Sequence, residues 1–368
     1  MPKPEDETAQ YSYRKRSFLP RTAQDTCFRL GVALGSGTIQ PDQIAAFREC
    51  LLPIAAKGVP QAAMEIREIA QLHRNADIVP AVERRSFLWP FSKQTTGTSK
   101  LLNQYPQLLD KFPDLGWLLM YHGNGFVRQA AIAALNDAPQ CPFELSAVVY
   151  RLNDWVENVR LAAIEYCENH LANTSADVLA ESAFFLIPQA RILHRWDKEG
   201  QRLLEEALYR PDVVEKLKDK FLGIRTGRVG HVFRQCLSRN DFDQYLLELS
   251  SQAAMPTIRA IAIEALLTQR ARWFVKRQKQ WVDKRYNVSK HVAVIESRPI
   301  DIVVDVETLL ETAASDRSSH VRKVAADVLI ERRHDASDRM NRIANLLLSD
   351  PNAAVRSRAE FFQSRNNK

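Results

Sequence analysis

The stretch Asp316-Arg-Ser-Ser-His-Val-Arg-Lys-Val-Ala325 contains the pattern that decides the fold. Its second half is an apolar residue, an Arg, two variable positions and an Ala. The apolar residue, the Ala and the position four residues later share one helical face, where a small Ala lets another helix approach closely. The sequence therefore predicts an amphipathic helix at each of six copies: Ile66-Arg67 with Ala70, Val127-Arg128 with Ala131, Val159-Arg160 with Ala163, Ile258-Arg259 with Ala262, Val321-Arg322 with Ala325, and Val355-Arg356 with Ala359.

The spacing of the copies indicates a repeat. Successive arginines are 61, 32, 99, 63 and 34 residues apart, close to whole multiples of about 32 residues, the length of a two-helix unit. Arg191 and Arg225 are candidate occupants of the skipped steps, because the segments that flank them have a helical pattern although the Val-Arg-Ala signature has drifted. We therefore expect roughly nine or ten helical pairs along the chain.

Three copies also carry an Asp six residues before the Arg, namely Asp154, Asp316 and Asp350. Each Asp stands where a turn should lead into a helix, so it can accept hydrogen bonds from the free N–H groups of that helix. The Arg of one copy is placed to reach the Asp of a neighbouring copy as a bidentate pair. The pattern thus predicts a ladder of ion pairs between repeats. Three copies depart from it, with Gln61, His122 and Ala253 at the position of the Asp.

Three segments carry a likeness to a known family: Asp154-Trp-Val-Glu-Asn-Val-Arg-Leu-Ala-Ala163, Asp316 to Ala325, and Asp350-Pro-Asn-Ala-Ala-Val-Arg-Ser-Arg-Ala359. They resemble the HEAT-repeat, or armadillo-like, family, in particular the short HEAT-like repeats of phycobilisome lyases and many bacterial adaptors. The resemblance covers about two thirds of the chain. It implies an all-α protein, a right-handed α-solenoid of stacked helix pairs with a concave binding surface. The alternative is a helical bundle without repeats.

The rest of the chain divides around this solenoid. We expect a mobile N-terminal segment over residues 1–20 and a single solenoid over 21–368. Two irregular insertions interrupt it, near 84–100 and 270–304. The first, RRSFLWPFSKQTTGTSK, has the composition of a loop, which either packs onto the solenoid or binds a partner.

The second insertion carries the excess charge of the molecule. From Arg270 to Lys290 there are eight bases and one acid, Asp283, and the rest of the chain holds 43 of each. Aromatic residues are interleaved with these bases, as in surfaces that bind nucleic acids or acidic proteins. The candidate binding residues are Arg270, Arg272, Trp273, Lys276, Arg277, Lys279, Trp281, Lys284 and Arg285.

Two structures are open for this region. A basic helical run could be a solvated face with its Trp and Phe turned into the core. The segment Val288 to Val304 is β-branched and roughly alternating, which favours a small hairpin whose turn is Ser297-Arg298-Pro299.

Known catalytic and metal motifs are absent from the sequence. It contains no H-E-x-x-H, no P-loop and no G-x-S-x-G, and its histidines do not form i, i+4 pairs. We expect no cofactor and no metal. Five scattered cysteines, no apolar run of about 20 residues and a polar N-terminus predict reduced thiols, no membrane insertion and a cytoplasmic location.

The expected function is a non-enzymatic scaffold or adaptor that binds a protein partner with an acidic surface. The alternative is a nucleic-acid-binding protein that uses the same basic segment. HEAT-like folds include alkylpurine DNA glycosylases, and that resemblance would recruit Trp281 and Asp283, or Trp196 and Asp197. A resemblance to lyases that attach bilins rests on the repeat alone. The partner and the oligomeric state are left open.

Overall fold

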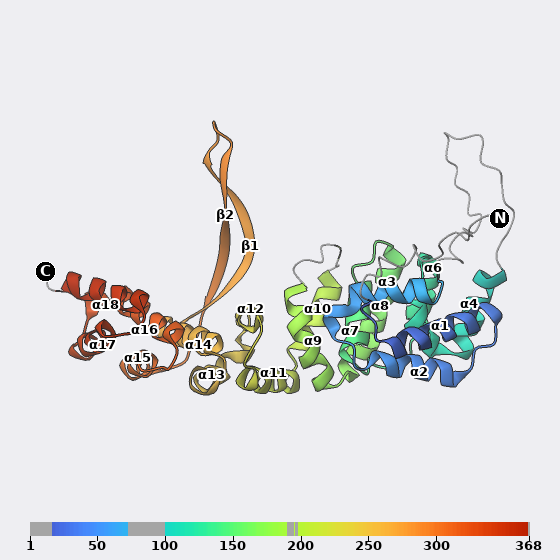
Figure 1. The fold of residues 1–368 in the computed structure, drawn as a ribbon, viewed down its shortest axis with the longest axis horizontal. Helices are drawn as coiled ribbons and strands as arrows, with labels where there is room; N and C mark the ends of the chain where they lie inside the picture. The colour runs from blue at the N-terminus through green and yellow to red at the C-terminus, as the bar shows by residue number, and fades with distance from the viewer. Residues whose placement is uncertain (1–16, 73–99, 190–194, 196–197, 367–368) are drawn as a thin grey trace, which may run out of the picture. The chain divides into compact units, whose positions relative to one another are not determined.

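The computed structural model describes residues 17–72, 100–189, 195 and 198–366. The described residues are mostly helical, with one two-stranded antiparallel sheet (Figure 1), as the sequence predicts. Most of the expected N-terminal segment and of the 84–100 insertion, together with Arg191, lies outside the described residues. The contacts group the chain into two compact units, one of residues 1–186 and 190–208, the other of 187–189 and 209–368. A single solenoid over 21–368 stays a prediction.

The first unit contains the helices up to Leu208. Pro residues begin α2 and α7, where the missing N–H costs nothing because the first turn has no acceptor for it. The α-helices are α1 (Arg21–Ser36), α2 (Pro41–Leu51), α3 (Val59–Ile69), α4 (Lys100–Lys111), α5 (Gly116–Leu119), α6 (Gly125–Ala134), α7 (Pro142–Arg151), α8 (Glu157–His170), α9 (Ala176–Gln189, whose last three residues fall in the second unit) and α10 (Lys198–Leu208), with 3₁₀ turns at Ala56–Gly58, Pro113–Leu115 and Leu171–Asn173.

The second unit contains the remaining helices and the sheet. Its elements are α11 (Pro211–Gly223), α12 (Val229–Cys236), α13 (Leu246–Gln252), α14 (Pro256–Thr268), β1 (Arg270–Asp283), β2 (Val288–Pro299), α15 (Val306–Ala314), α16 (Ser319–Glu331), α17 (Asp338–Leu348) and α18 (Ala353–Asn366), with 3₁₀ turns at Asn240–Tyr245 and Arg333–Asp335. No described helix combines the length and the apolar character needed to cross a membrane.

Each copy of the repeat pattern forms a helix, and its apolar stripe is buried as predicted. On α16, Val321, Ala325 and Leu329 have no exposed surface, and their counterparts on α14 are equally buried. In each helix pair of this part of the chain, the helix that carries the repeat pattern comes second. These second helices pack side by side, α14 against α16 and α16 against α18. Each also packs against the first helix of its own pair, which is α13, α15 or α17. The helices from α14 to α18 therefore share one continuous core.

The small Ala of the pattern does allow close approach. A Cβ on Gly31 of α1 would meet the backbone of Ala70 at 2.6 Å, and one on Gly116 of α5 would meet the carbonyl of Ala131 at 2.4 Å. Real Cβ atoms do not come this close, so glycine is needed opposite the Ala in both places. Two copies in the first unit thus use a Gly against Ala contact to bring helices together.

The predicted ladder is confirmed within each unit. In three copies the Nε and Nη2 atoms of the Arg donate to both carboxylate oxygens of the next Asp, at 2.5–3.0 Å. The Nη1 atom of each Arg also donates to the carbonyl six residues before it. We call these pairs the rungs: Arg128 with Asp154 in the first unit, and Arg259 with Asp316 and Arg322 with Asp350 in the second.

The expected helix cap needs a correction. Asp316 accepts the backbone N–H of Ser318 at 2.7 Å, and Asp350 accepts that of Asn352 at 2.7 Å. These residues directly precede the helices, so the Asp fixes the turn before the helix rather than its first N–H groups. Ser318 itself caps α16 by accepting from the N–H of His320. The reason is position, because the Asp lies two residues too early to reach the first helical turn.

The departures from the pattern have different consequences. The Asp of the pattern accepts a backbone N–H in the turn and pairs with an Arg. His122 keeps the first of these roles, because its Nδ1 accepts the N–H of Asn124 at 2.9 Å. The opposing Arg67 donates from Nε to the carbonyl of Tyr121 at 2.9 Å but has no carboxylate partner among the described residues. The segments that flank Arg225 are helical as expected, since they form α11 and α12, but Arg225 itself is exposed in the loop between them and does not take the repeat position on a helix.

Candidate functional site

The basic segment is a β-strand and not a helix. β1 pairs with β2 in antiparallel register, from Arg270 opposite Pro299 to Asp283 opposite Val288. The chain leaves α14 through Gln269, which has a positive φ of 51°, and it reverses near Asn287, which has a φ of 53°. We call residues 270–299 the hairpin arm, which projects from the helices of the second unit (Figure 1).

The predicted turn is therefore in the wrong place. Ser297, Arg298 and Pro299 lie at the end of β2, opposite the first residues of β1. The true turn follows Asp283, which accepts the backbone N–H of Arg285 at 2.8 Å. Asp before a turn and Asn in the left-handed conformation are common turn residues, so this signal was present in the sequence. A hairpin within 270–304 is confirmed.

The base of the hairpin arm is anchored to the helices. Arg298 donates to the carboxylate of Asp243 and, at 3.0 Å, to the carbonyl of Leu237. Gln235 of α12 donates to the carbonyl of Phe274 at 2.9 Å, and Ala271 is fully buried. The first strand thus leaves the helical core in a fixed direction.

Two of the candidate residues belong to this base. Arg270 donates to the hydroxyl of Ser297 at 2.8 Å. Arg272 lies 3.5 Å from the carboxylate of Glu264, which also pairs with Arg234 at 2.7 Å. Their guanidinium groups are already engaged by the protein, so we place Arg270 and Arg272 in the support of the arm.

The other candidate bases lie on the outer part of the arm. Lys276, Arg277, Lys279 and Lys284 are exposed, and none has a carboxylate partner among the described residues. Arg285 is paired with Asp283 at 3.2 Å, and hydrogen bonds from Arg285 lower the pKa of that carboxyl group. Most of the positive charge here is therefore not neutralised by the protein.

The register sorts the side chains onto two faces. Cross-strand partners share a face, so Arg277 lies beside Ala293 and Lys279 beside His291 on one face. Lys276 lies beside Val294 on the opposite face. The first face carries Arg270, Arg272, Phe274, Arg277, Lys279 and Trp281 from β1 and contains no acid.

If the basic segment were a helix, its Trp and Phe side chains would be turned into the protein core. On the hairpin arm the outer aromatic side chains are exposed instead. Trp281 is 41% exposed and Tyr286 is 77% exposed, while Trp273 and Phe274 are half-buried nearer the base. Lys279 holds its Nζ 3.8 Å from the centre of the Trp281 ring, a cation–π contact at a solvated site. Further apolar side chains are exposed along the arm: Val282, Val288, Val292 and Ile295.

Trp281 and Asp283, one of the two pairs considered for glycosylase-like chemistry, are each engaged by a neighbouring basic side chain of the arm. Asp283 lies at the tip of the arm with its carboxylate on Arg285, and Trp281 is engaged by Lys279. Trp196 and Asp197 lie outside the described residues.

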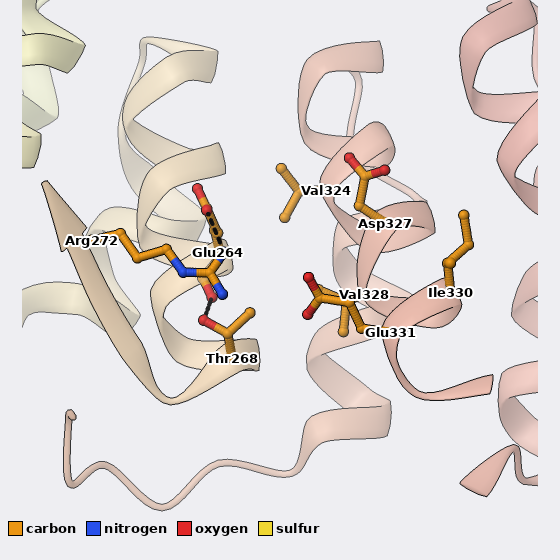
Figure 2. A pocket seen from close by; sticks show the side chains of 8 residues that line it. All are labelled: Glu264, Thr268, Arg272, Val324, Asp327, Val328, Ile330 and Glu331. Carbon is orange, nitrogen blue, oxygen red and sulfur yellow. Dashed lines mark hydrogen bonds and ion pairs between the residues drawn. The ribbon is translucent and has the colours of Figure 1, made fainter. Parts of the chain in front are cut away.

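A pocket of about 390 Å³ lies between α14 and α16, next to the base of the arm. Figure 2 shows Glu264, Thr268 and Arg272 on one side and the side chains of α16 on the other. Two of its acids are already paired, Glu264 with Arg234 and Arg272 and Asp327 with Arg358. No group of described His, Cys, Asp or Glu side chains is arranged to hold a metal ion. The pocket is lined by Glu264, Thr268, Arg272, Val324, Asp327, Val328, Ile330 and Glu331.

No protein-family model matches this sequence, and a search of curated proteins finds no significant match.

Proposed function

We propose that the chain is a HEAT-like right-handed α-solenoid that acts as a non-enzymatic scaffold in the cytoplasm and binds a protein with an acidic surface. The concave face of the solenoid and the hairpin arm would form the binding surface. The rungs support the solenoid assignment, because each joins one copy of the repeat to the next.

The observation that carries the binding function is the unneutralised charge of the arm. The arm holds nine bases and two acids, and the other charges of the chain balance. A two-stranded hairpin has little stability of its own in water. This one is held at its base and presents exposed bases and exposed apolar side chains beyond it. Such a surface suits an acidic partner, since opposite charges speed association and fix its orientation.

The test is capture of partners from the lysate of the native host by the tagged full-length chain, with nuclease present. The variant carries Arg277→Glu, Lys279→Glu and Lys284→Glu. A matched control reverses three exposed bases of the same unit that are not part of the arm, Arg225, Arg228 and Arg342.

A stoichiometric protein that survives nuclease, is lost with the arm variant and is kept by the control supports the proposal. Equal capture by the wild type and the arm variant would remove the arm from the binding surface.

Nucleic-acid binding is the second candidate, favoured by the exposed Trp281 beside Lys279. Lysines would take phosphates and the indole could stack on a base. Affinity for an oligonucleotide should then fall steeply as salt is raised, because each phosphate contact releases counterions. An alkylpurine DNA glycosylase-like activity belongs to this candidate, and release of a methylated base by the full chain, lost with Asp283→Asn, would support it.

A further inference from the structure

The two strands of the hairpin arm present different outer edges. β1 has register shifts between Phe274 and Lys276 and between Trp281 and Asp283, and near its base it contacts Gln235 of α12. β2 runs without a shift from Val288 to Pro299. Bulges twist a strand edge away from further pairing. The regular edge of the arm is therefore that of β2.

The edge of β2 also lacks the usual protection against pairing. Its middle, His291-Val-Ala-Val-Ile295, contains no Lys, Arg, Asp, Glu or Pro. β1 is the only strand paired with β2 among the described residues. Every second residue of an edge strand points its N–H and C=O outward, so β2 offers a row of backbone groups to another strand.

We infer that the acidic partner binds by adding an extended strand to the outer edge of β2. This inference rests on the function proposed above and specifies how the partner binds. Strand addition gives affinity through backbone hydrogen bonds and specificity through alternate side chains. The added strand also turns a two-stranded arm into a three-stranded sheet, which is more stable.

The two faces of the arm define the sequence of the added strand. On one face its side chains lie directly beside Val292 and Val294, with Gln278 and a single base, Lys276, behind them on β1, so apolar residues fit there. On the other face they lie beside His291 and Ala293, beyond which β1 presents Lys279 and Arg277. Two strand spacings are roughly 10 Å, which a long basic side chain and a Glu can span together over the small Ala293. The partner segment therefore alternates apolar and acidic residues.

A second copy of this chain is a poor occupant of the same edge. Each arm carries a net charge of +7, and like charges placed on neighbouring strands repel. The alternating acidic segment is favoured by the same charge that opposes self-pairing.

The experiment uses the full-length chain and three labelled probes, with affinity measured by fluorescence anisotropy. The first is a capped peptide of alternating Glu and Val, which can form a strand. The second is a capped peptide with the same number of Glu residues in which two Pro follow each Glu, so that Pro falls on both edges of an extended strand and neither edge keeps a continuous row of N–H groups. The third is a single-stranded oligonucleotide.

We expect the Glu-Val peptide to bind at least about tenfold more tightly than the Glu-Pro peptide, because backbone pairing adds to charge. Hydrogen exchange of residues 288–299 should slow on binding. Two single variants, Val292→Pro and Ala293→Pro, sharpen the result, because neighbouring residues point their N–H groups to opposite edges. The variant whose lost N–H faced outward should keep the hairpin, as shown by unchanged hydrogen exchange in the free chain. That variant should no longer bind the Glu-Val peptide more tightly than the Glu-Pro peptide.

Each contrary result has a separate meaning. Equal binding of both peptides overturns strand addition and leaves an acidic partner in place. Failure of both peptides to bind also overturns strand addition, and the capture experiment then decides whether the scaffold function stands. Binding of the oligonucleotide alone overturns both the strand and the acidic protein partner.

Discussion

The rungs and the hairpin arm use the same residue type in opposite ways. Arg128 and Asp154 of one rung are each 2% exposed at the side chain, and the guanidinium donates to a carboxylate and to backbone carbonyls. Arg277 on the arm is exposed and has no carboxylate partner among the described residues. The comparison shows that the number of arginines does not reveal their role, whereas the position of the nearest acid does.

The largest effect should come from breaking a buried rung. Arg128→Ala leaves Asp154 buried with only Arg151 as a cationic partner, and removing one member of a buried pair costs about 3–5 kcal/mol. Urea unfolding followed by circular dichroism measures the loss. The matched control is Arg277→Ala, which should change the free energy of unfolding by less than about 0.5 kcal/mol. Similar losses in both variants would contradict the division of roles.

The second largest effect is expected from acid, which should weaken the rungs by protonating their carboxylates. Burial alone would raise the pKa of Asp154, but hydrogen bonds from Arg128 and from the N–H of Val156 outweigh it and hold the pKa below its usual value. A lowered pKa in the folded state means that this stabilisation is complete above about pH 4 and is lost as the pH falls through the lower folded value.

The free energy of unfolding should therefore decline as the pH falls below about 4. Asp154→Asn should start from a lower stability and show a smaller decline. Unfolding curves at several pH values make the comparison. Parallel declines in the two proteins would show that Asp154 does not contribute to the pH dependence.

At His122, opposite Arg67, a rung can be added rather than removed. His122 is fully buried, and burial with the nearby Arg128 and Arg67 lowers its pKa to about 4, so it is neutral and gives Arg67 no counter-charge. His122→Asp should place a carboxylate within reach of Arg67. A double-mutant cycle with Arg67→Ala should then show a coupling of about 1 kcal/mol. No coupling would mean that the position six residues before the Arg does not by itself make a rung.

The smallest effect on stability is expected at the outer arm. Arg277→Glu with Lys279→Glu should shift the free energy of unfolding by less than about 0.5 kcal/mol, since both side chains are exposed. Urea unfolding followed by circular dichroism, as for the rung variants, gives the value. A large loss of stability would mean that the arm is part of the core.

The sequence predicts the rungs because they depend on short spacings. An apolar stripe at i, i+4 and i+8 and an Asp six residues before an Arg are local patterns that a repeat preserves. The hairpin arm lacks such a local signal, because Lys, Arg and Gln are good helix formers and Lys is depleted in strands, so Lys276 to Gln280 fits a helix as well as a strand. The contact of Arg298 with Asp243 joins residues 55 positions apart, and no local pattern encodes it.

The most direct test of the account is a photo-crosslinking experiment at the tip of the arm. A photoreactive amino acid replaces Tyr286, which is 77% exposed, or Leu346 of α17, which is 55% exposed, and the full chain is irradiated in the native lysate with nuclease. We predict a protein adduct at Tyr286 that disappears when Arg277, Lys279 and Lys284 are changed to Glu. An adduct at Leu346 with none at Tyr286 would contradict it, because the partner would then contact the helices and not the arm.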